Sequence, residues 1–175
     1  MLEEMMNQQA GKYTKKDLET LEEQERILQF EHFTSQDAFE LGKVIVECAP
    51  KYKEGIAINI QRCSDQGIIF QYMDDSKAER NFGFAKGKRN TVLQTGHNSL
   101  WALVKSVVDG KINLIETEED PAYPVGGAYP IYVEGKMVAT VALSGLHHGN
   151  DFNLLVEALS KYLGKEIPTF QAEIL

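Results

Sequence analysis

The segment Met137–Leu143 restricts the possible folds of this chain more than any other stretch. It reads Met-Val-Ala-Thr-Val-Ala-Leu, so nearly every position is apolar or small, and the alternation of a half-exposed strand is missing. Continuous apolar runs of this length are typical of a strand that is covered on both faces. We therefore expect a central strand in a sheet with helices on each side.

Two β-hairpins are predicted, and this strand belongs to the second. In the first hairpin, isoleucines alternate with small or polar residues from Gly55 to Arg62, and the chain returns over Ile68–Met73 after a turn. In the second, Ala128–Val133 leads through a short turn at Gly135 into the apolar strand. Strands joined by short turns are antiparallel, so an antiparallel sheet is expected.

Helical patterns surround the two hairpins. Thr14 and Thr34 are each followed three residues later by an aspartate, which is the pattern of a capped helix start. Three further helices are expected at about 76–94, from Asn98 onward, and after Asn150 or Asp151, while residues 111–125 are expected to form a loop or short edge strand. The order α-α-β-β-α-α-β-β-α predicts an α/β (α+β) fold with a central antiparallel sheet and helices on its faces.

The first helix carries a thin apolar stripe of Leu18, Leu21 and Leu28 among many glutamates. We expect this helix to lie on the surface or to pack on a partner subunit. Residues 1–13 have little pattern and are predicted to be a flexible leader, and residues 14–175 are predicted to form one domain.

Composition narrows the class of protein. With 43% hydrophobic and 25% charged residues, the chain is ordinary for a globular protein rather than a disordered one. No apolar run approaches the roughly 20 residues that span a bilayer, and the first residues lack the pattern of a signal peptide. We expect a cytoplasmic protein that does not bind membranes. The net charge of -8 argues against binding to nucleic acid.

A basic segment lies within this acidic chain. From Lys77 to Lys111 there are seven basic residues and only two acidic ones, Glu79 and Asp109. Such a segment marks either a site for a small anionic ligand or a solvated helix face. Within it, Lys88 and Thr91 would share one face of a helix. If that face meets a glycine loop, a cation and a hydroxyl would line an anion pocket.

Gly126 and Gly127 form such a loop before a predicted strand. Paired glycines allow backbone amides to approach a ligand closely, or they only provide a tight entry to the strand or a bulge.

The two cysteines, Cys48 and Cys63, lie in segments with a periodic apolar pattern and are expected to be buried thiols. The alternative is a disulfide or a reactive thiol.

The junction Ser144–Asp151 gathers several reactive side chains between a strand and a helix. His147 and His148 would need a third ligand such as His97 or Asp151 to bind a metal, and the alternative is that they are simply exposed. Ser144, His147 and Asp151 also suggest a hydrolytic triad, but the nucleophile elbow is missing and triads are rarely this local.

Four segments together resemble a known family. They are the helix start Thr34-Ser35-Gln36-Asp37-Ala38-Phe39-Glu40-Leu41-Gly42, the hairpin 56–73, the stretch 86–91, and Gly126-Gly127-Ala128-Tyr129-Pro130-Ile131 with Thr140-Val141-Ala142-Leu143-Ser144-Gly145. Residues 34–163 resemble the haem-degrading-domain family of GlcG-like and HbpS-like proteins, in its branch of small cytosolic proteins of the UPF0303 type. The relatives' Ser-Gly junction usually continues with small and acidic residues, whereas His147 and His148 follow here.

The resemblance implies a profilin-like α-β-α sandwich, assembly into dimers or larger rings, and a role related to haem. Our first hypothesis is a homo-oligomeric protein that binds haem or another small anionic ligand. One alternative is an interaction or scaffold protein without a substrate. The other is an enzyme that acts on a small anionic or tetrapyrrole substrate, with His147 or His148 as the acid–base group. The residues expected at the ligand are Lys88, Thr91, Gly126, Gly127, Ser144 and Gly145. Those expected at a metal or haem are His147, His148 and His97.

Overall fold

The computed structural model describes residues 4, 7–8, 11–111 and 113–173. Its helices are α2 (Lys15–Ile27), α3 (Ser35–Cys48), α4 (Arg80–Thr95), α5 (Ser99–Asp109) and α6 (His148–Leu163), with a 3-10 helix at Ala49–Tyr52. Its strands are β1 (Ala57–Arg62), β2 (Ile68–Met73), β3 (Ala128–Val133) and β4 (Lys136–Ser144). The predicted order of helices and strands is confirmed.

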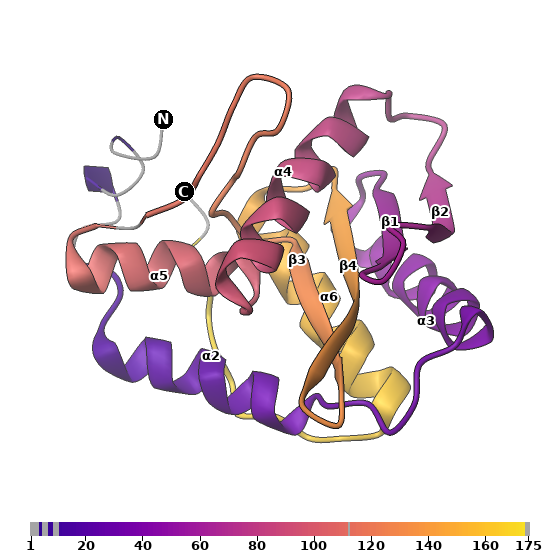
Figure 1. Ribbon diagram of the computed structural model, residues 1–175, viewed down its shortest axis with the longest axis horizontal. Coiled ribbons are helices and arrows are strands. Elements are labelled where there is room, and N and C mark those ends of the chain that lie inside the picture. Colours follow the sequence, from indigo (N-terminus) through magenta and orange to yellow (C-terminus); the bar gives the residue numbers. More distant parts are fainter. Residues whose placement is uncertain (1–3, 5–6, 9–10, 112, 174–175) are drawn as a thin grey trace.

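The four strands form one antiparallel sheet in the order β2-β1-β4-β3 (Figure 1). The apolar segment is the core of β4, which pairs with β1 on one side and with β3 on the other. Opposite Leu143 stands Ile58, and opposite Val141 stand Ile60 of β1 and Tyr129 of β3. The prediction of a central strand covered on both faces is therefore confirmed for Ala139–Leu143, which are buried, while Met137 and Val138 at its start are half-buried.

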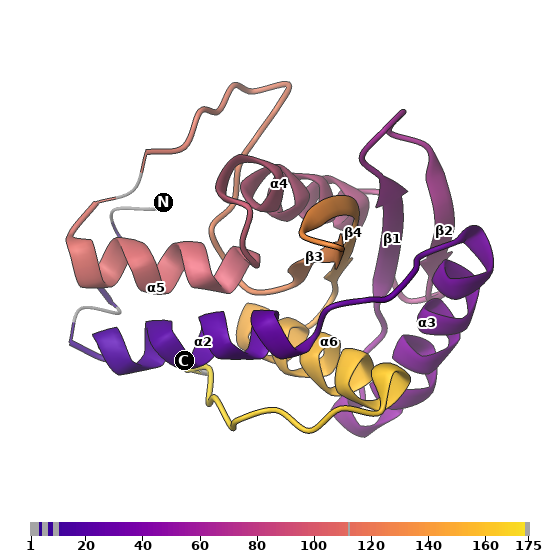
Figure 2. The same ribbon diagram turned by 60° about the horizontal axis from the view of Figure 1, so that its bottom comes forward.

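Helices cover both faces of the sheet, with α3 and α6 on one face and α4 on the other (Figure 2). The α3–α6 side holds the main core, to which β1 and β4 contribute Ile58, Ile60, Val141 and Leu143. Under α4 the apolar cluster is small and consists of Ala85, Val92, Ala128 and Ala142, with Met137 against it. Because these side chains are short, room remains under α4 for larger polar ones. The predicted α+β fold is confirmed.

Both predicted capping boxes are present. Thr14 and Thr34 accept hydrogen bonds from the backbone N–H of Asp17 and Asp37, and each aspartate accepts in return from the N–H of its threonine. Burial raises the pKa of the Asp37 carboxyl, but hydrogen bonds from Thr34, His32 and Tyr162 outweigh it and hold that pKa at about 2. Because the capping contacts join residues only three positions apart, the starts of the first two helices could be predicted from the sequence.

Two predicted helix starts were wrong. Helix α4 begins at Arg80 rather than near 76, because Ser76 donates its N–H and its hydroxyl to the Asp74 carboxylate and closes a turn there. Helix α6 begins at His148 rather than after Asn150 or Asp151, because the His147 ring accepts the Gly149 N–H and serves as the cap. Between residues 111 and 125, the described part of the chain is a loop without a strand.

Helix α2 packs within the chain, chiefly on α5. Its stripe is buried, with exposed fractions of 7% for Leu18, 0% for Leu21 and 2% for Leu28. Of the two predicted alternatives, the structure agrees with the first: α2 lies on the surface of the protein, and its stripe packs on the chain's own core. Most of the predicted leader, residues 1–3, 5–6 and 9–10, lies outside the described residues. Tyr13 at its end is buried and stacks on Phe170.

Among the described residues, no helix combines the length and apolar character needed to cross a membrane.

Candidate functional site

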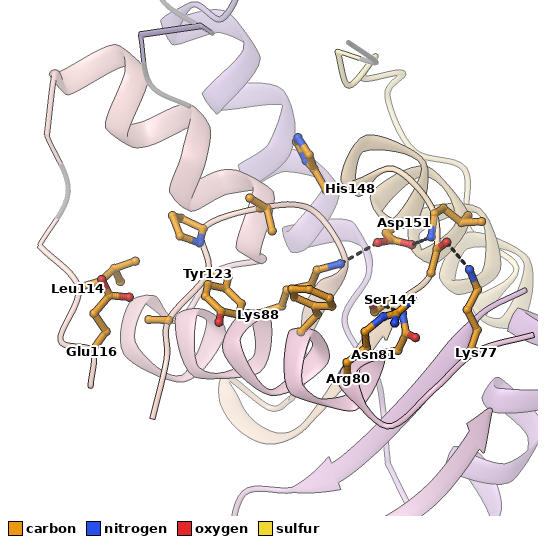
Figure 3. A pocket seen from close by; sticks show the side chains of 16 residues that line it. Lys77, Arg80, Asn81, Lys88, Leu114, Glu116, Tyr123, Ser144, His148 and Asp151 are labelled. Atoms are coloured by element: carbon orange, nitrogen blue, oxygen red, sulfur yellow. Dashed lines mark hydrogen bonds and ion pairs between the residues drawn. The ribbon is translucent and has the colours of Figure 1, made fainter. Parts of the chain in front are cut away.

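A cavity of about 590 Å³ opens beside α4 (Figure 3). Three parts of the chain line it: α4 with the turn before it, the loop that follows α5, and the junction between β4 and α6. The lining residues are Lys77, Arg80, Asn81, Phe84, Lys88, Leu114, Glu116, Ala122, Tyr123, Pro124, Val125, Ser144, Gly145, Leu146, His148 and Asp151. The volume is typical of a pocket for a small organic molecule.

A buried ion pair between Lys88 of α4 and Asp151 of α6 lines this cavity, and we call the buried polar part of the lining around it the floor. The Lys88 ammonium lies 2.7 Å from Asp151 Oδ2 and donates a second hydrogen bond of 3.0 Å to the backbone oxygen of Leu143. The other oxygen of Asp151 accepts the Leu146 N–H. Only 4% of Lys88 and 1% of Asp151 are exposed. Burial raises the pKa of Asp151, and the Lys88 charge opposes this rise.

Asn81 and Ser144 lie beside the ion pair (Figure 3). The Asn81 amide donates to the Ser144 hydroxyl oxygen at 3.3 Å, and its carbonyl oxygen accepts the N–H of Ala78. Both residues are buried. The floor therefore consists of four buried polar side chains whose positions are fixed by hydrogen bonds from α4, β4 and α6.

The walls of the cavity are mainly apolar. Phe84 and Tyr123 face each other with their ring centroids 6.2 Å apart, and Ala122, Pro124 and Val125 continue the wall. The loop is attached to α4, because Tyr123 donates its N–H to the Gly87 oxygen and its ring occupies the space that a side chain at Gly87 would need. Asn90 of α4 holds the same loop through Asp120 and Pro121.

Positive charge dominates the lining. Lys77, Arg80 and Lys88 stand against the carboxylates of Glu116 and Asp151, so the cavity carries one excess positive charge in a chain whose net charge is -8. Lys77 donates to the Gly145 oxygen at 2.9 Å, and Arg80 is exposed. Because Lys88 is neutralised by Asp151, the excess comes from Lys77 and Arg80, which we call the rim, against the single carboxylate of Glu116.

In both of the adjacent histidines, ring atom Nδ1 accepts a hydrogen bond from a backbone N–H of the chain. Nδ1 of His147 accepts the Gly149 N–H at 3.1 Å, and Nδ1 of His148 accepts the Gly126 N–H at 3.3 Å. A neutral imidazole that accepts at Nδ1 carries its proton on Nε2. Burial lowers the pKa of both rings, with the Lys88 charge contributing, and brings that of His148 to about 4. Both rings are therefore neutral at pH 7, with an N–H at Nε2.

His97 belongs to a different part of the molecule. Its ring lies 2.7 Å from the Glu25 carboxylate and stacks on Trp101 at 3.8 Å between ring centroids. The described residues hold no group of three or more histidine, cysteine, aspartate or glutamate side chains placed to share a metal ion. The structure thus does not bring the three predicted metal or haem ligands together. Cys48 and Cys63 are free thiols, and burial raises the pKa of each.

The hydrolytic triad is not assembled in the described residues. Asp151 is bonded to Lys88 and to the Leu146 N–H, Ser144 is bonded to Asn81, and His147 caps its own helix. Each member thus has another partner.

Of the residues predicted to bind a ligand, Lys88, Ser144 and Gly145 line the cavity, as does His148 from the second set. Thr91 does not, because its hydroxyl donates to the Gly87 oxygen inside α4. Gly126 and Gly127 stand behind the floor. A Cβ at Gly127 would lie 2.6 Å from the Lys88 nitrogen and 2.7 Å from the Leu143 oxygen, so this glycine gives the ion pair its space.

The lining residues that were not predicted include Lys77, Arg80, Asn81, Phe84 and Tyr123. The basic segment contains the first two, so the interpretation of that segment as an anion site already pointed to them. Tyr123 lies in a loop without periodicity, and only the three-dimensional path of that loop brings it to the cavity.

The fold and the cavity together define an α+β protein with a cavity large enough for a small molecule. The family model described as haem degrading protein HbpS-like matches residues 33–160. The chain belongs to this HbpS-like family.

Curated relatives carry the name UPF0303 protein. One from Rhizobium johnstonii is 34% identical over 162 residues, which cover 89% of this chain and 96% of the relative. One from Streptomyces coelicolor is 37% identical over 150 residues, which cover 83% of this chain and 92% of the relative.

Solved structures agree in fold. The Ybr137w protein superposes with a TM-score of 0.74 at 25% identity, covering 84% of this chain and 87% of that one. The protein in a PduOC:heme complex superposes with a TM-score of 0.61 at 16% identity, and the match covers 73% of this chain and 93% of that one.

Loss of one member of the Lys88–Asp151 ion pair should destabilise the fold more than loss of both members. Replacing Lys88 by Met leaves Asp151 buried without its partner and should lower the free energy of unfolding by about 3–5 kcal/mol. The double variant Lys88→Met/Asp151→Leu should recover part of that loss, as measured by urea denaturation. Lys105→Met is the matched control, because the Lys105–Asp109 pair is exposed and such pairs contribute less than about 1 kcal/mol. A double variant as unstable as the single one would contradict this account.

His148 should make the protein sensitive to mild acid. Between its usual pKa of 6.5 and its folded value of about 4, the unfolded chain binds a proton that the folded chain does not. The free energy of unfolding should therefore fall as the pH drops through this window, by up to roughly 1.4 kcal/mol per pH unit. His148→Asn keeps an acceptor for the Gly126 N–H but cannot titrate. Denaturation at about pH 7 and about pH 5 should show a loss in the wild type that exceeds that of the variant by about 1–2 kcal/mol. Equal losses would show that His148 is not held neutral.

Proposed function

We propose that this chain is a binding protein for a small organic anion with a flat apolar body, and that a tetrapyrrole carboxylate such as haem is the first candidate. The observation that carries the proposal is the combination, in one cavity, of the rim cations Lys77 and Arg80 with the aromatic wall of Phe84 and Tyr123.

Each part of the cavity matches a part of such a ligand. The wall of aromatic and aliphatic side chains suits a flat apolar ring system, whose burial supplies most of the binding free energy. The rim cations suit carboxylates, since hydrogen bonds between charged groups are stronger than neutral ones. The exposed Arg80 and the half-buried Lys77 also draw an anion toward a protein that is otherwise acidic.

The comparisons support haem as the first probe. The family is described as haem degrading, and one protein of similar fold, PduOC, has been solved as a complex with haem. At 16% identity that likeness concerns the fold alone. The choice of ligand for this chain therefore rests on the cavity.

The residues present fit the organic part of haem better than its iron. An iron ligand needs a free lone pair on an imidazole nitrogen. In both His147 and His148, Nδ1 accepts a backbone N–H, so Nε2 carries the proton. We therefore propose that a tetrapyrrole is recognised by its carboxylates and ring faces, without an iron–histidine bond.

The alternatives have less support. The scaffold hypothesis rested on the apolar stripe of α2, which the chain itself buries. An acid–base role for His147 or His148 has less support, because Nδ1 of each ring is occupied by a backbone N–H and burial lowers the pKa of both rings. The cytoplasmic location stays a prediction.

We also propose that the chain acts as a homo-oligomer, as the family resemblance implies. Strand β2 is an edge of the sheet, and its Ile68 and Met73 are exposed. Unpaired strand edges with exposed apolar side chains favour pairing between chains. Sedimentation velocity should give a mass at least twice the 19.7 kDa of one chain, and a single species of one chain would contradict the proposal.

Titration with haemin and with metal-free protoporphyrin tests the proposed function. Both should bind with similar affinity, followed by Soret absorbance and by porphyrin fluorescence, because the carboxylates and ring are common to both. The double variant Lys77→Gln/Arg80→Gln should weaken both by about tenfold or more, as expected for the loss of charge-assisted hydrogen bonds. Lys105→Gln, which removes a cation outside the cavity, should not.

The outcomes separate the versions of this proposal. Binding of haemin alone would show that iron ligation carries the affinity and would contradict recognition through carboxylates. Failure of both porphyrins to bind would remove tetrapyrroles from the proposal.

A further inference from the structure

The floor of the cavity contains hydrogen-bond donors that have no acceptor among the described residues. The Lys88 ammonium has three N–H groups, and two of them bind Asp151 and the Leu143 oxygen. Ser144 accepts from Asn81, and its own hydroxyl hydrogen has no acceptor among the described residues. Lys88 and Ser144 are each only 4% exposed and both line the cavity. A buried donor without a partner is costly, so these positions favour a ligand atom that accepts.

The acceptors of the floor are already engaged. Asp151 accepts from Lys88 with one oxygen and from the Leu146 N–H with the other, and the Asn81 oxygen accepts the Ala78 N–H. A ligand hydroxyl or amine placed here would compete with these bonds. The floor is therefore suited to an oxygen that accepts hydrogen bonds and has none to give.

Charge decides which kind of oxygen fits. The Lys88–Asp151 pair is neutral as a whole and almost completely buried. A carboxylate brought to Lys88 would stand next to that of Asp151, and like charges repel strongly where little water screens them. An uncharged carbonyl oxygen would accept the same hydrogen bonds without this repulsion. Carboxylates are instead suited to the rim, where Lys77 and Arg80 carry the excess charge.

We propose that the cavity binds its ligand in one orientation, with an uncharged carbonyl oxygen on Lys88 and Ser144 at the floor and a carboxylate at the rim. The ligand class is thus a flat carboxylic acid that carries, besides its carboxylate, a ketone or amide oxygen. This inference rests on the general part of the proposed function, the binding of a flat organic anion, which requires only the rim and the walls. The orientation requires the floor as well, and a porphyrin, which has no ketone or amide oxygen, would bind without using the floor donors.

Three matched benzoates test the floor. Para-acetylbenzoate has a ketone opposite its carboxylate, para-isopropylbenzoate has nearly the same shape without the oxygen, and terephthalate has a second carboxylate. Binding is followed by amide NMR signals of cavity residues, which detects weak ligands and locates them. Para-acetylbenzoate should bind about tenfold tighter than either analogue, as expected for a hydrogen bond to a charged donor.

A variant pair assigns this preference to the floor. Ser144→Ala removes one donor and should reduce the preference for the acetyl over the isopropyl compound severalfold, while Ser106→Ala should leave it unchanged. Ser106 is also a buried serine; it lies on α5, where its hydroxyl donates to the Leu103 oxygen outside the cavity. Amide spectra of both variants show whether the fold is kept.

Each result has a distinct meaning. If terephthalate binds tightest, or if all three compounds bind equally well, the floor proposal is wrong while binding of organic anions stands. If none of the three binds although protoporphyrin does, the floor proposal again fails alone. If neither the benzoates nor the porphyrins bind, both proposals fail. An unchanged preference in a folded Ser144→Ala protein would overturn the role given to Ser144.

Discussion

The ion pair between Lys88 and Asp151 connects the parts of this molecule that make the cavity. It joins α4, which covers one face of the sheet, to the first turn of α6, which covers the other, around the end of β4. The Leu143 oxygen takes part in the same contact, and Gly127 leaves space for it. Because a buried charge is tolerated only with its partner, this pair fixes where the two helices meet.

The small side chains beneath α4 follow from this arrangement. Alanines at positions such as 85 and 142 let the helix approach the sheet closely, and the lysine of the same helix then reaches the end of β4. The other face has long apolar side chains and forms an ordinary core. The two faces thus have different tasks: one stabilises the fold, and the other carries the polar floor and the rim of the cavity.

The sequence predicts those features that depend on neighbouring residues. The apolar β4, the two hairpins and the capping boxes at Thr14 and Thr34 are local, and all were predicted correctly. The role of Asp151 was not, because its partner Lys88 lies 63 positions away, and a helix cap was the simpler local explanation. Thr91 shares a helix with Lys88, but a hydrogen bond to Gly87 holds its hydroxyl inside that helix, which spacing cannot show.

The rate at which the Lys88 ammonium exchanges its protons with water tests the buried ion pair most directly. In a protein labelled with ¹⁵N at the lysine Nζ atoms, a buried and hydrogen-bonded ammonium exchanges its protons slowly and gives a resolved signal near neutral pH. We predict one such protected signal that disappears in Lys88→Met and shifts when a carbonyl-bearing ligand binds. If the Lys88 signal instead shows the rapid exchange of a solvated side chain, the buried ion pair does not form and the floor of the cavity is not built as described.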